Sequence, residues 1–273
     1  MGGLTTAAAP PVPPAVARQR NIILITLVVL AAIGWAVFLD QAREPTGMGD
    51  MGMADMGMAD MGAGPDLTMG RDWPLFMTMW VAMMVAMMFP AAAPMIVMYG
   101  RMRRSDPPSV ILFTAAYIAL WVVFGVGAYL LSAAVELAAS DSEWVAMNWG
   151  RVGGGLIVLA GIYQLTPLKD ICLRHCRTPL AFVMTHWHEG RVGAVRMGLV
   201  HGLYCVGCCW LFFLILIPLG VMNAAAMLAV AAIVFAEKVL PHGRAIGLAA
   251  ALVLVVVGIA VAAEPALLPT VTS

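Results

Sequence analysis

Residues 73–98 read WPLFMTMWVAMMVAMMFPAAAPMIVM and contain no charged side chain. A helix needs about 20 mostly apolar residues to cross the hydrocarbon core of a bilayer, so this stretch is long enough to span one. The rest of the chain has the same character, since 62% of the residues are hydrophobic and 11% are charged, against about 25% charged in an ordinary soluble domain. The sequence therefore predicts an all-α, polytopic membrane helical bundle.

Apolar runs of membrane-spanning length predict about seven transmembrane helices. Their approximate ranges are 21–39, 73–99, 110–137, 152–168, 197–221, 224–239 and 245–263. The first run is expected to be an N-terminal transmembrane anchor, and the other six form a membrane core over residues 73–263. A cleaved signal peptide is the alternative for the first run, but its apolar stretch is longer than a usual signal core.

Basic residues are predicted to gather on one side of the membrane, where the positive-inside rule retains them. They are Arg18, Arg20, Arg101, Arg103, Arg104, Lys169, Arg174, Arg177, Arg191, Arg196 and Arg244, with Arg43, Arg71 and Arg151 as exceptions. This pattern predicts a multi-pass protein of the bacterial cytoplasmic (inner) membrane with its N-terminus inside and its C-terminus outside. Residues 1–20 are then a disordered cytoplasmic tail, residues 40–72 an extracytoplasmic Met-rich segment, and residues 264–273 an extracytoplasmic tail.

The segment before the second run contains a five-residue repeat, MGMAD, within the 22 methionines of the chain. Thioethers are soft ligands that have no proton to lose and suit Cu(I) in an oxidising space. The copper ligands predicted here are Met48, Met51, Met53, Met56, Met58 and Met61. The repeat is similar to the Met-rich arms of copper importers, and the alternative is a low-complexity linker.

Methionines also line one face of the run at 73–98, which predicts a ladder of thioethers inside the membrane. Its central members are Met84, Met87 and Met88, next to the helix-kinking Pro90 and Pro94. The alternative is that methionine acts as a flexible apolar filler between helices.

His201, Cys205, Cys208 and Cys209 share one helical face of the fifth run. Counting about 1.5 Å per residue puts these thiols at a depth similar to Met87, so the two sulfur groups are expected to meet. Together they predict a Cu(I) site of low coordination number. Cysteine as a small apolar filler and a disulfide-exchange pair at Cys205 and Cys208 are the alternatives.

A second group, Cys172, His175 and Cys176, lies in the loop before this run and predicts a metal site near the inner surface, with zinc as a possible ion. Haem attachment is disfavoured because the order of the motif is wrong. His186 and His188 are available as further ligands, but histidines in such a loop are more often only solvated.

Two charged residues follow in the sixth run, at positions 237 and 238. An ionisable group at this depth needs a partner or access to the interface. Glu237 is therefore expected to pair with a histidine or an arginine, and Lys238 is expected to snorkel to the interface.

The motifs as a whole resemble a bacterial family of predicted metal-binding integral membrane proteins of unknown function. The resemblance covers roughly residues 73–262. It rests on the Met-Met pairs and prolines between Trp80 and Met98, on Thr166-Pro-Leu-Lys169 leading to Cys172 and Cys176, and on Gly202 to Trp210 with its three cysteines. It implies metal binding without implying a reaction.

The favoured function is that of a Cu(I)-binding membrane protein that gathers, relays or stores copper. The alternatives are an accessory subunit of a membrane enzyme, such as a copper-dependent membrane monooxygenase, and a membrane thiol redox protein. Expected partners are the lipid bilayer, the metal ion, and other membrane subunits or a copper chaperone. Nucleic acid is excluded because 15 basic residues balance 15 acidic ones. No nucleotide-binding loop is present, and the pattern favours a binding role over an enzyme.

Overall fold

The computed structural model describes residues 14–43, 67–68, 73–103, 106–220 and 223–268, and these residues are almost entirely helical. The helices are α1 (Pro14–Arg43), α2 (Trp73–Met102), α3 (Pro107–Asp141), α4 (Glu143–Tyr163), α5 (Pro167–Arg177), α6 (Pro179–Thr185), α7 (Gly190–Leu214), α8 (Ala224–Val239) and α9 (Gly243–Ala263), followed by a 3-10 turn η1 (Pro265–Leu267). The all-α prediction is confirmed. The chain is a multi-pass membrane protein, because six of these helices are long and apolar enough to cross a membrane: α1, α2, α3, α4, α7 and α9.

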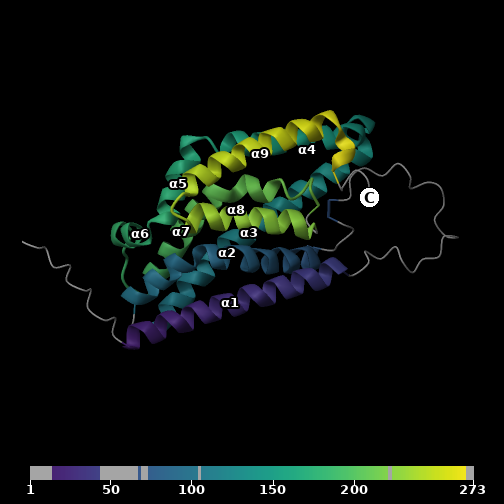
Figure 1. Ribbon diagram of the computed structural model, residues 1–273. Coiled ribbons are helices and arrows are strands. Elements are labelled where there is room, and N and C mark those ends of the chain that lie inside the picture. Colours follow the sequence, from purple (N-terminus) through teal and green to yellow (C-terminus); the bar gives the residue numbers. More distant parts are fainter. Residues whose placement is uncertain (1–13, 44–66, 69–72, 104–105, 221–222, 269–273) are drawn as a thin grey trace, which may run out of the picture.

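The long helices lie side by side as a bundle (Figure 1). Helix α1 packs along α2 at one side, α4 packs along α9 at the other, and α3, α7 and α8 lie between them. Helix α2 is the most enclosed of the six spans. Of the residues in its 18-residue apolar stretch 61% are buried, against 22% in the corresponding stretch of α1. The methionine-rich helix is therefore the centre of the bundle and not a lipid-facing rod.

Helix α8 differs from the other predicted spans. It has 16 residues, about 24 Å of helix, which is less than the roughly 30 Å hydrocarbon core. Pro218 before it lies beside Gly153, midway along α4, while Leu240 after it accepts a hydrogen bond from Arg177 of α5. The seventh predicted span is therefore a short helix of the bundle and is not among the six helices long enough to cross a membrane.

Two other predicted boundaries move. The expected span at 152–168 begins earlier, at Glu143, and ends at Tyr163, because Thr166 caps a new helix that has Pro167 in its first turn. The expected span at 197–221 begins at Gly190 and ends at Leu214. Helix α1 likewise begins before the predicted anchor, at Pro14.

Hydrogen bonds tie the basic segments together at one end of the bundle. Gln19 of α1 donates to the carbonyl of Gly100 at 2.9 Å, and Arg103 after α2 donates to His188 before α7 at 2.8 Å. We call this the arginine-rich end; it includes the start of α1, the end of α2, α5, α6, the start of α7 and the α8–α9 turn. At the opposite end, Glu136 accepts hydrogen bonds from Leu67 and Thr68, which precede α2. The predicted separation of charge along the bundle is present.

Candidate metal centre

Helix α7 carries Cys205, Cys208 and Cys209 on the face that packs into the bundle. Their side chains are 0%, 1% and 2% exposed. The helix lies close against α3 because Gly198 has no side chain, and a Cβ there would collide with the carbonyl of Phe113. Small residues commonly allow such close approach between membrane helices. The tight packing of α7 on α3 holds the three thiols away from lipid.

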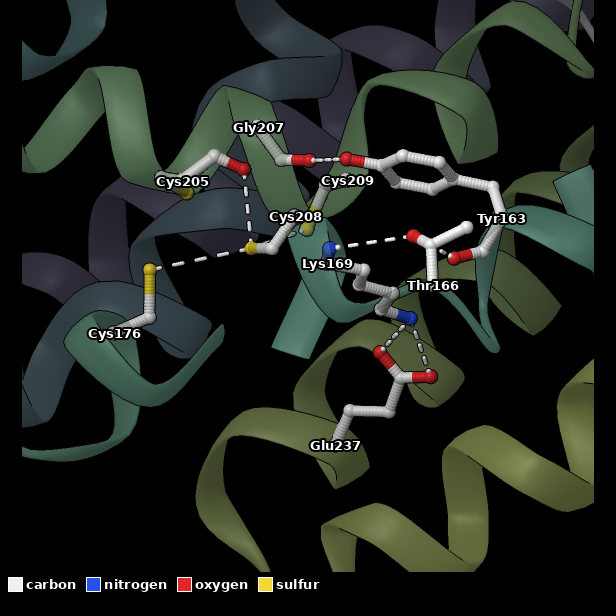
Figure 2. A network of polar contacts seen from close by, with 9 residues as sticks. All are labelled: Tyr163, Thr166, Lys169, Cys176, Cys205, Gly207, Cys208, Cys209 and Glu237. Carbon is white, nitrogen blue, oxygen red and sulfur yellow. Dashed lines mark hydrogen bonds and ion pairs between the residues drawn. The ribbon is translucent and has the colours of Figure 1, made fainter. Parts of the chain in front are cut away.

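Five sulfur-bearing side chains meet at this point, and we call them the sulfur cluster: Met88, Cys176, Cys205, Cys208 and Cys209. The Sγ atom of Cys205 lies 4.0 Å from Sδ of Met88. The Sγ atom of Cys208 lies 3.3 Å from that of Cys209 and 4.0 Å from that of Cys176. Figure 2 shows Cys176 reaching across from α5 toward Cys208. The expected meeting of thioether and thiols is therefore present, at Met88.

The sulfur cluster lies near the middle of the bundle. Met88 is 15 residues from Trp73 and 14 from Met102, so about 22 Å and 21 Å of helix separate it from the two ends of α2. This is the depth that the sequence predicts for the thiols.

The spacing of the sulfurs suits a shared ion of low coordination number. Two sulfurs 4.0 Å apart, as in Cys176 and Cys208, subtend an angle of about 120° at an ion that lies about 2.3 Å from each. Within the described residues, no group of three or more His, Cys, Asp or Glu side chains is arranged to hold a metal ion. The cluster instead offers pairs of thiols with a thioether nearby, a soft donor set.

A buried ammonium group faces the cluster. Lys238 of α8 is 7% exposed, and its Nζ atom lies 2.9 Å from Sγ of Cys205. The hydroxyl of Tyr117, on α3, lies 3.1 Å from the same sulfur. The expectation that Lys238 snorkels is wrong, because its side chain points into the bundle toward Cys205 and is enclosed there. A positive charge so deep needs a partner, and Sγ of Cys205 accepts a hydrogen bond from this ammonium group.

The neighbouring Glu237 also points inward, as predicted, but its partner differs from the prediction. Its two carboxylate oxygens accept hydrogen bonds of 2.9 and 2.7 Å from Nζ of Lys169, on α5, as Figure 2 shows. Both side chains are at most 3% exposed. The expected histidine or arginine is not the partner, because α5 folds back against α7 and brings Lys169 to Glu237.

A cavity of about 770 Å³ opens beside this ion pair, between α5 and the start of α9. Asp170, His242 and Arg244 line it together with Lys169 and Glu237. The ion pair therefore forms part of the wall of a cavity at the arginine-rich end, and Glu237 in that wall is one residue along the chain from Lys238.

The family can be assigned from the chain itself. Residues 77–261, about two thirds of the chain, match the family described as "PpoB2: Copper chaperone". This chain belongs to that copper chaperone family. The search of curated proteins and the search of solved structures each returned no match. The match confirms the copper-handling function expected from the sequence and makes the resemblance to metal-binding membrane proteins more specific. It includes every member of the sulfur cluster and excludes the repeat at Met48–Met61.

In this copper chaperone, His201 lies one helical turn before Cys205. The imidazole is 2% exposed, and neither ring nitrogen has a hydrogen-bond partner among the described residues. The rings of Phe113 and Tyr117 stack on it, with centroids 5.9 and 5.3 Å away. Buried polar groups are normally paired, so the ring nitrogens of His201 are available as ligand atoms next to the cluster. Its assignment as a copper ligand stays a prediction.

The side chains of the expected group, Cys172, His175 and Cys176, do not converge, because each contacts a different part of the structure. Cys176 joins the sulfur cluster, and Cys172 lies under Gly207 of α7, where burial raises the pKa of its thiol. The ring of His175 does not point toward the two cysteines, and the three side chains form no three-ligand group in the described structure. A zinc site built from these three side chains is therefore not formed in the structure.

The remaining predicted ligands are thioethers. Met84 and Met87 are 1% and 2% exposed, but so are Met79 and Met83, which lie off the predicted face. Neighbouring helices enclose most of α2, so burial does not set the ladder apart, and Met88 is the member with a contact to a cysteine in the described residues. The arm residues Met48, Met51, Met53, Met56, Met58 and Met61 lie outside the described residues.

Sequence reasoning missed Lys169, Lys238 and Tyr117 as neighbours of the site. A signal existed for Lys238, since a lysine next to a glutamate in an apolar helix marks an interior functional group. Nothing in the sequence near Tyr117 distinguishes it from other aromatic residues of a membrane helix.

Proposed function

We propose that the protein binds Cu(I) at the sulfur cluster and relays it across the bacterial cytoplasmic membrane. The observation that supports this most is the convergence of thiols and a thioether from α2, α5 and α7 at mid-depth in a buried site. Soft sulfur ligands select Cu(I), whereas carboxylate and water ligands, which suit Mg²⁺ and Ca²⁺, do not line this cluster. The ion is the cargo of the protein and not a resident cofactor.

The charge of the site supports the same ion. A Cu(I) ion bound by two thiolates carries a net charge of −1, which is costly to hold in a low-dielectric interior without compensation. Lys238 lies 2.9 Å from Cys205 and makes the complex neutral. A divalent ion in the same pair of thiolates forms a neutral complex and leaves the ammonium of Lys238 without a counter-charge, so the site discriminates by charge as well as by softness.

A route to the cluster follows from the order of soft ligands along the chain. The arm at Met48–Met61 gathers the ion outside the membrane, and Met84 and Met87 are available along α2 before Met88. Each transfer exchanges one sulfur ligand for another, so successive sites differ little in affinity. The positive-inside rule places the arginine-rich end in the cytoplasm, which puts the N-terminus inside and directs the ion from the arm toward the inner surface.

The experiment is metal analysis of the detergent-purified, full-length protein after anaerobic loading with Cu(I). We expect Cys205→Ser/Cys208→Ser to lose the copper of the cluster. The matched control is Cys172→Ser, which removes a buried thiol outside the cluster and keeps wild-type copper. A second variant without residues 48–61 is expected to keep the cluster copper and lose only what the arm binds. Copper at wild-type stoichiometry in Cys205→Ser/Cys208→Ser would remove the assignment.

A second candidate function is supported by the family description. A chaperone hands its cargo to another protein, so this chain also fits an accessory subunit that supplies copper to a membrane enzyme, such as a copper-dependent membrane monooxygenase. This function predicts that the protein copurifies with other membrane subunits and that copper-loaded protein activates them. Thiol trapping of Cys205 and Cys208 with and without a copper chelator tests the third possibility, thiol redox exchange, which predicts a disulfide independent of copper.

A further inference from the structure

Two imidazole rings lie close together at the arginine-rich end, outside the membrane-spanning helices. His175 is on α5 and His186 directly follows α6, and their ring centroids are 6.2 Å apart. Both rings are partly exposed. The proposed relay through the sulfur cluster does not use this pair.

Hydrogen bonds define the tautomer of both rings. Nδ1 of His175 lies 2.8 Å from the carbonyl oxygen of Ile171, and Nδ1 of His186 lies 3.2 Å from that of Phe182. A carbonyl oxygen can only accept, so Nδ1 of His175 carries the proton and its Nε2 keeps a free lone pair. Nδ1 of His186 also lies 2.9 Å from the hydroxyl of Thr185, which donates to the carbonyl of Ala181 at 2.8 Å, so the tautomer with the proton on Nδ1 satisfies both contacts of His186. Metal-ligating histidines almost always have this arrangement, with the second nitrogen donating to a carbonyl or carboxylate.

Aromatic neighbours hold both rings in place. His175 stacks on Tyr204 of α7, with centroids 4.0 Å apart and an interplanar angle of 1°. His186 stacks on Phe182, with centroids 4.6 Å apart. His175 directly precedes Cys176, and Tyr204, on which His175 stacks, directly precedes Cys205, so one imidazole of the pair lies next to the sulfur cluster.

We propose that His175 and His186 form a second Cu(I) site, through their Nε2 atoms, that receives the ion from the sulfur cluster at the arginine-rich end. The proposal rests on the proposed function. An ion bound by two imidazoles lies about 2.0–2.1 Å from each nitrogen, so the ring centres of such a pair are about 5–6.5 Å apart. The observed 6.2 Å falls in this range. Imidazole binds copper readily and gives a cytoplasmic acceptor a more exposed ion than the buried sulfurs do.

The test is X-ray absorption spectroscopy of the full-length protein in lipid nanodiscs, loaded anaerobically with Cu(I) until binding is saturated. We expect imidazole nitrogen in the copper coordination shell of the wild type. The variants His175→Phe, which keeps the stacking on Tyr204, and His186→Gln are made in a His201→Phe background, which removes the imidazole beside the sulfur cluster, and should lose the nitrogen while sulfur-bound copper remains. The matched control is His188→Gln, because Nδ1 of His188 likewise lies 2.8 Å from a backbone carbonyl, that of His186, and the His188 ring makes no ring contact with either imidazole of the pair in the described part of the chain.

The outcomes separate this site from the sulfur cluster. Nitrogen coordination that persists in His175→Phe/His186→Gln overturns the second site, and so does its loss in the His188→Gln control alone. Loss of sulfur coordination in Cys205→Ser/Cys208→Ser with nitrogen coordination retained supports both sites. Unchanged sulfur coordination in that cysteine variant overturns the sulfur cluster and leaves the result for the imidazole pair standing by itself.

Discussion

Lys238 is expected to determine how tightly the sulfur cluster holds Cu(I). The substitution Lys238→Met keeps a long, flexible, apolar side chain and removes the positive charge that lies 2.9 Å from Cys205. Lys238→Arg is the matched control, since it changes the shape of the head group and keeps the charge.

The magnitude follows from Coulomb's law. Two unit charges about 4 Å apart attract by about 4 kcal/mol at an effective dielectric constant of about 20. Because neighbouring groups relax when the charge is removed, we expect about 2–4 kcal/mol of lost copper binding. Each 1.4 kcal/mol is about tenfold in affinity, so the dissociation constant for Cu(I) should rise about 30- to 700-fold.

The assay is an anaerobic competition titration with a chromophoric Cu(I) chelator in detergent at neutral pH. The thermal unfolding of the copper-free protein is measured alongside it. We expect Lys238→Met to unfold no more readily than the wild type, because the variant no longer buries an ammonium group and Cys205 can take up a proton to become neutral. A Cu(I) affinity within threefold of the wild type would refute the argument that Lys238 compensates the charge of the bound complex.

Two further predictions concern stability. Glu237→Gln leaves the ammonium of Lys169 buried without a counter-charge and should lower the free energy of unfolding by about 3–5 kcal/mol, measured by thermal unfolding in detergent. Lys169→Met/Glu237→Leu removes both charges and should recover most of this lost stability. A double variant as unstable as the single one would contradict this. Gly154→Leu should push α4 away from α9, because a Cβ there would lie 2.6 Å from the backbone nitrogen of Ala262. It should lower the unfolding temperature by more than Gly155→Leu, because a Cβ at Gly155 would meet nothing within 4 Å. Equal effects of the two substitutions would count against close α4–α9 packing.

The helices of the bundle could be predicted because the bilayer imposes a strict local rule. Each spanning segment must satisfy its own backbone hydrogen bonds and present about 20 apolar residues, so length and hydropathy report it directly. The rule is weakest where the segment is short or interrupted. The end of α4 at Tyr163 was therefore predicted less well, because a capping threonine and a proline can end a helix inside an apolar run, whereas the bounds of α8 agree with the predicted run at 224–239.

The candidate site was predictable only within single helices. Cys205, Cys208 and Cys209 share a face because of helical periodicity, and depth counted along two helices was enough to bring Met88 near them. Which residue of a neighbouring helix completes the contact depends on crossing angles and rotations, which spacing along one chain segment does not encode.

The sequence by itself determined that this protein crosses the membrane several times, that its basic segments gather at one end, and that soft sulfur ligands occur at mid-depth, because each of these depends on local composition and period. Only the tertiary structure decided that Cys176 and Lys238 reach Cys208 and Cys205, and that Lys169 pairs with Glu237. These contacts exist because α5 folds back against α7 and α8, and because the side chain of Lys238 points into the bundle. Both features depend on how separate helices pack together and not on the residues of either helix alone.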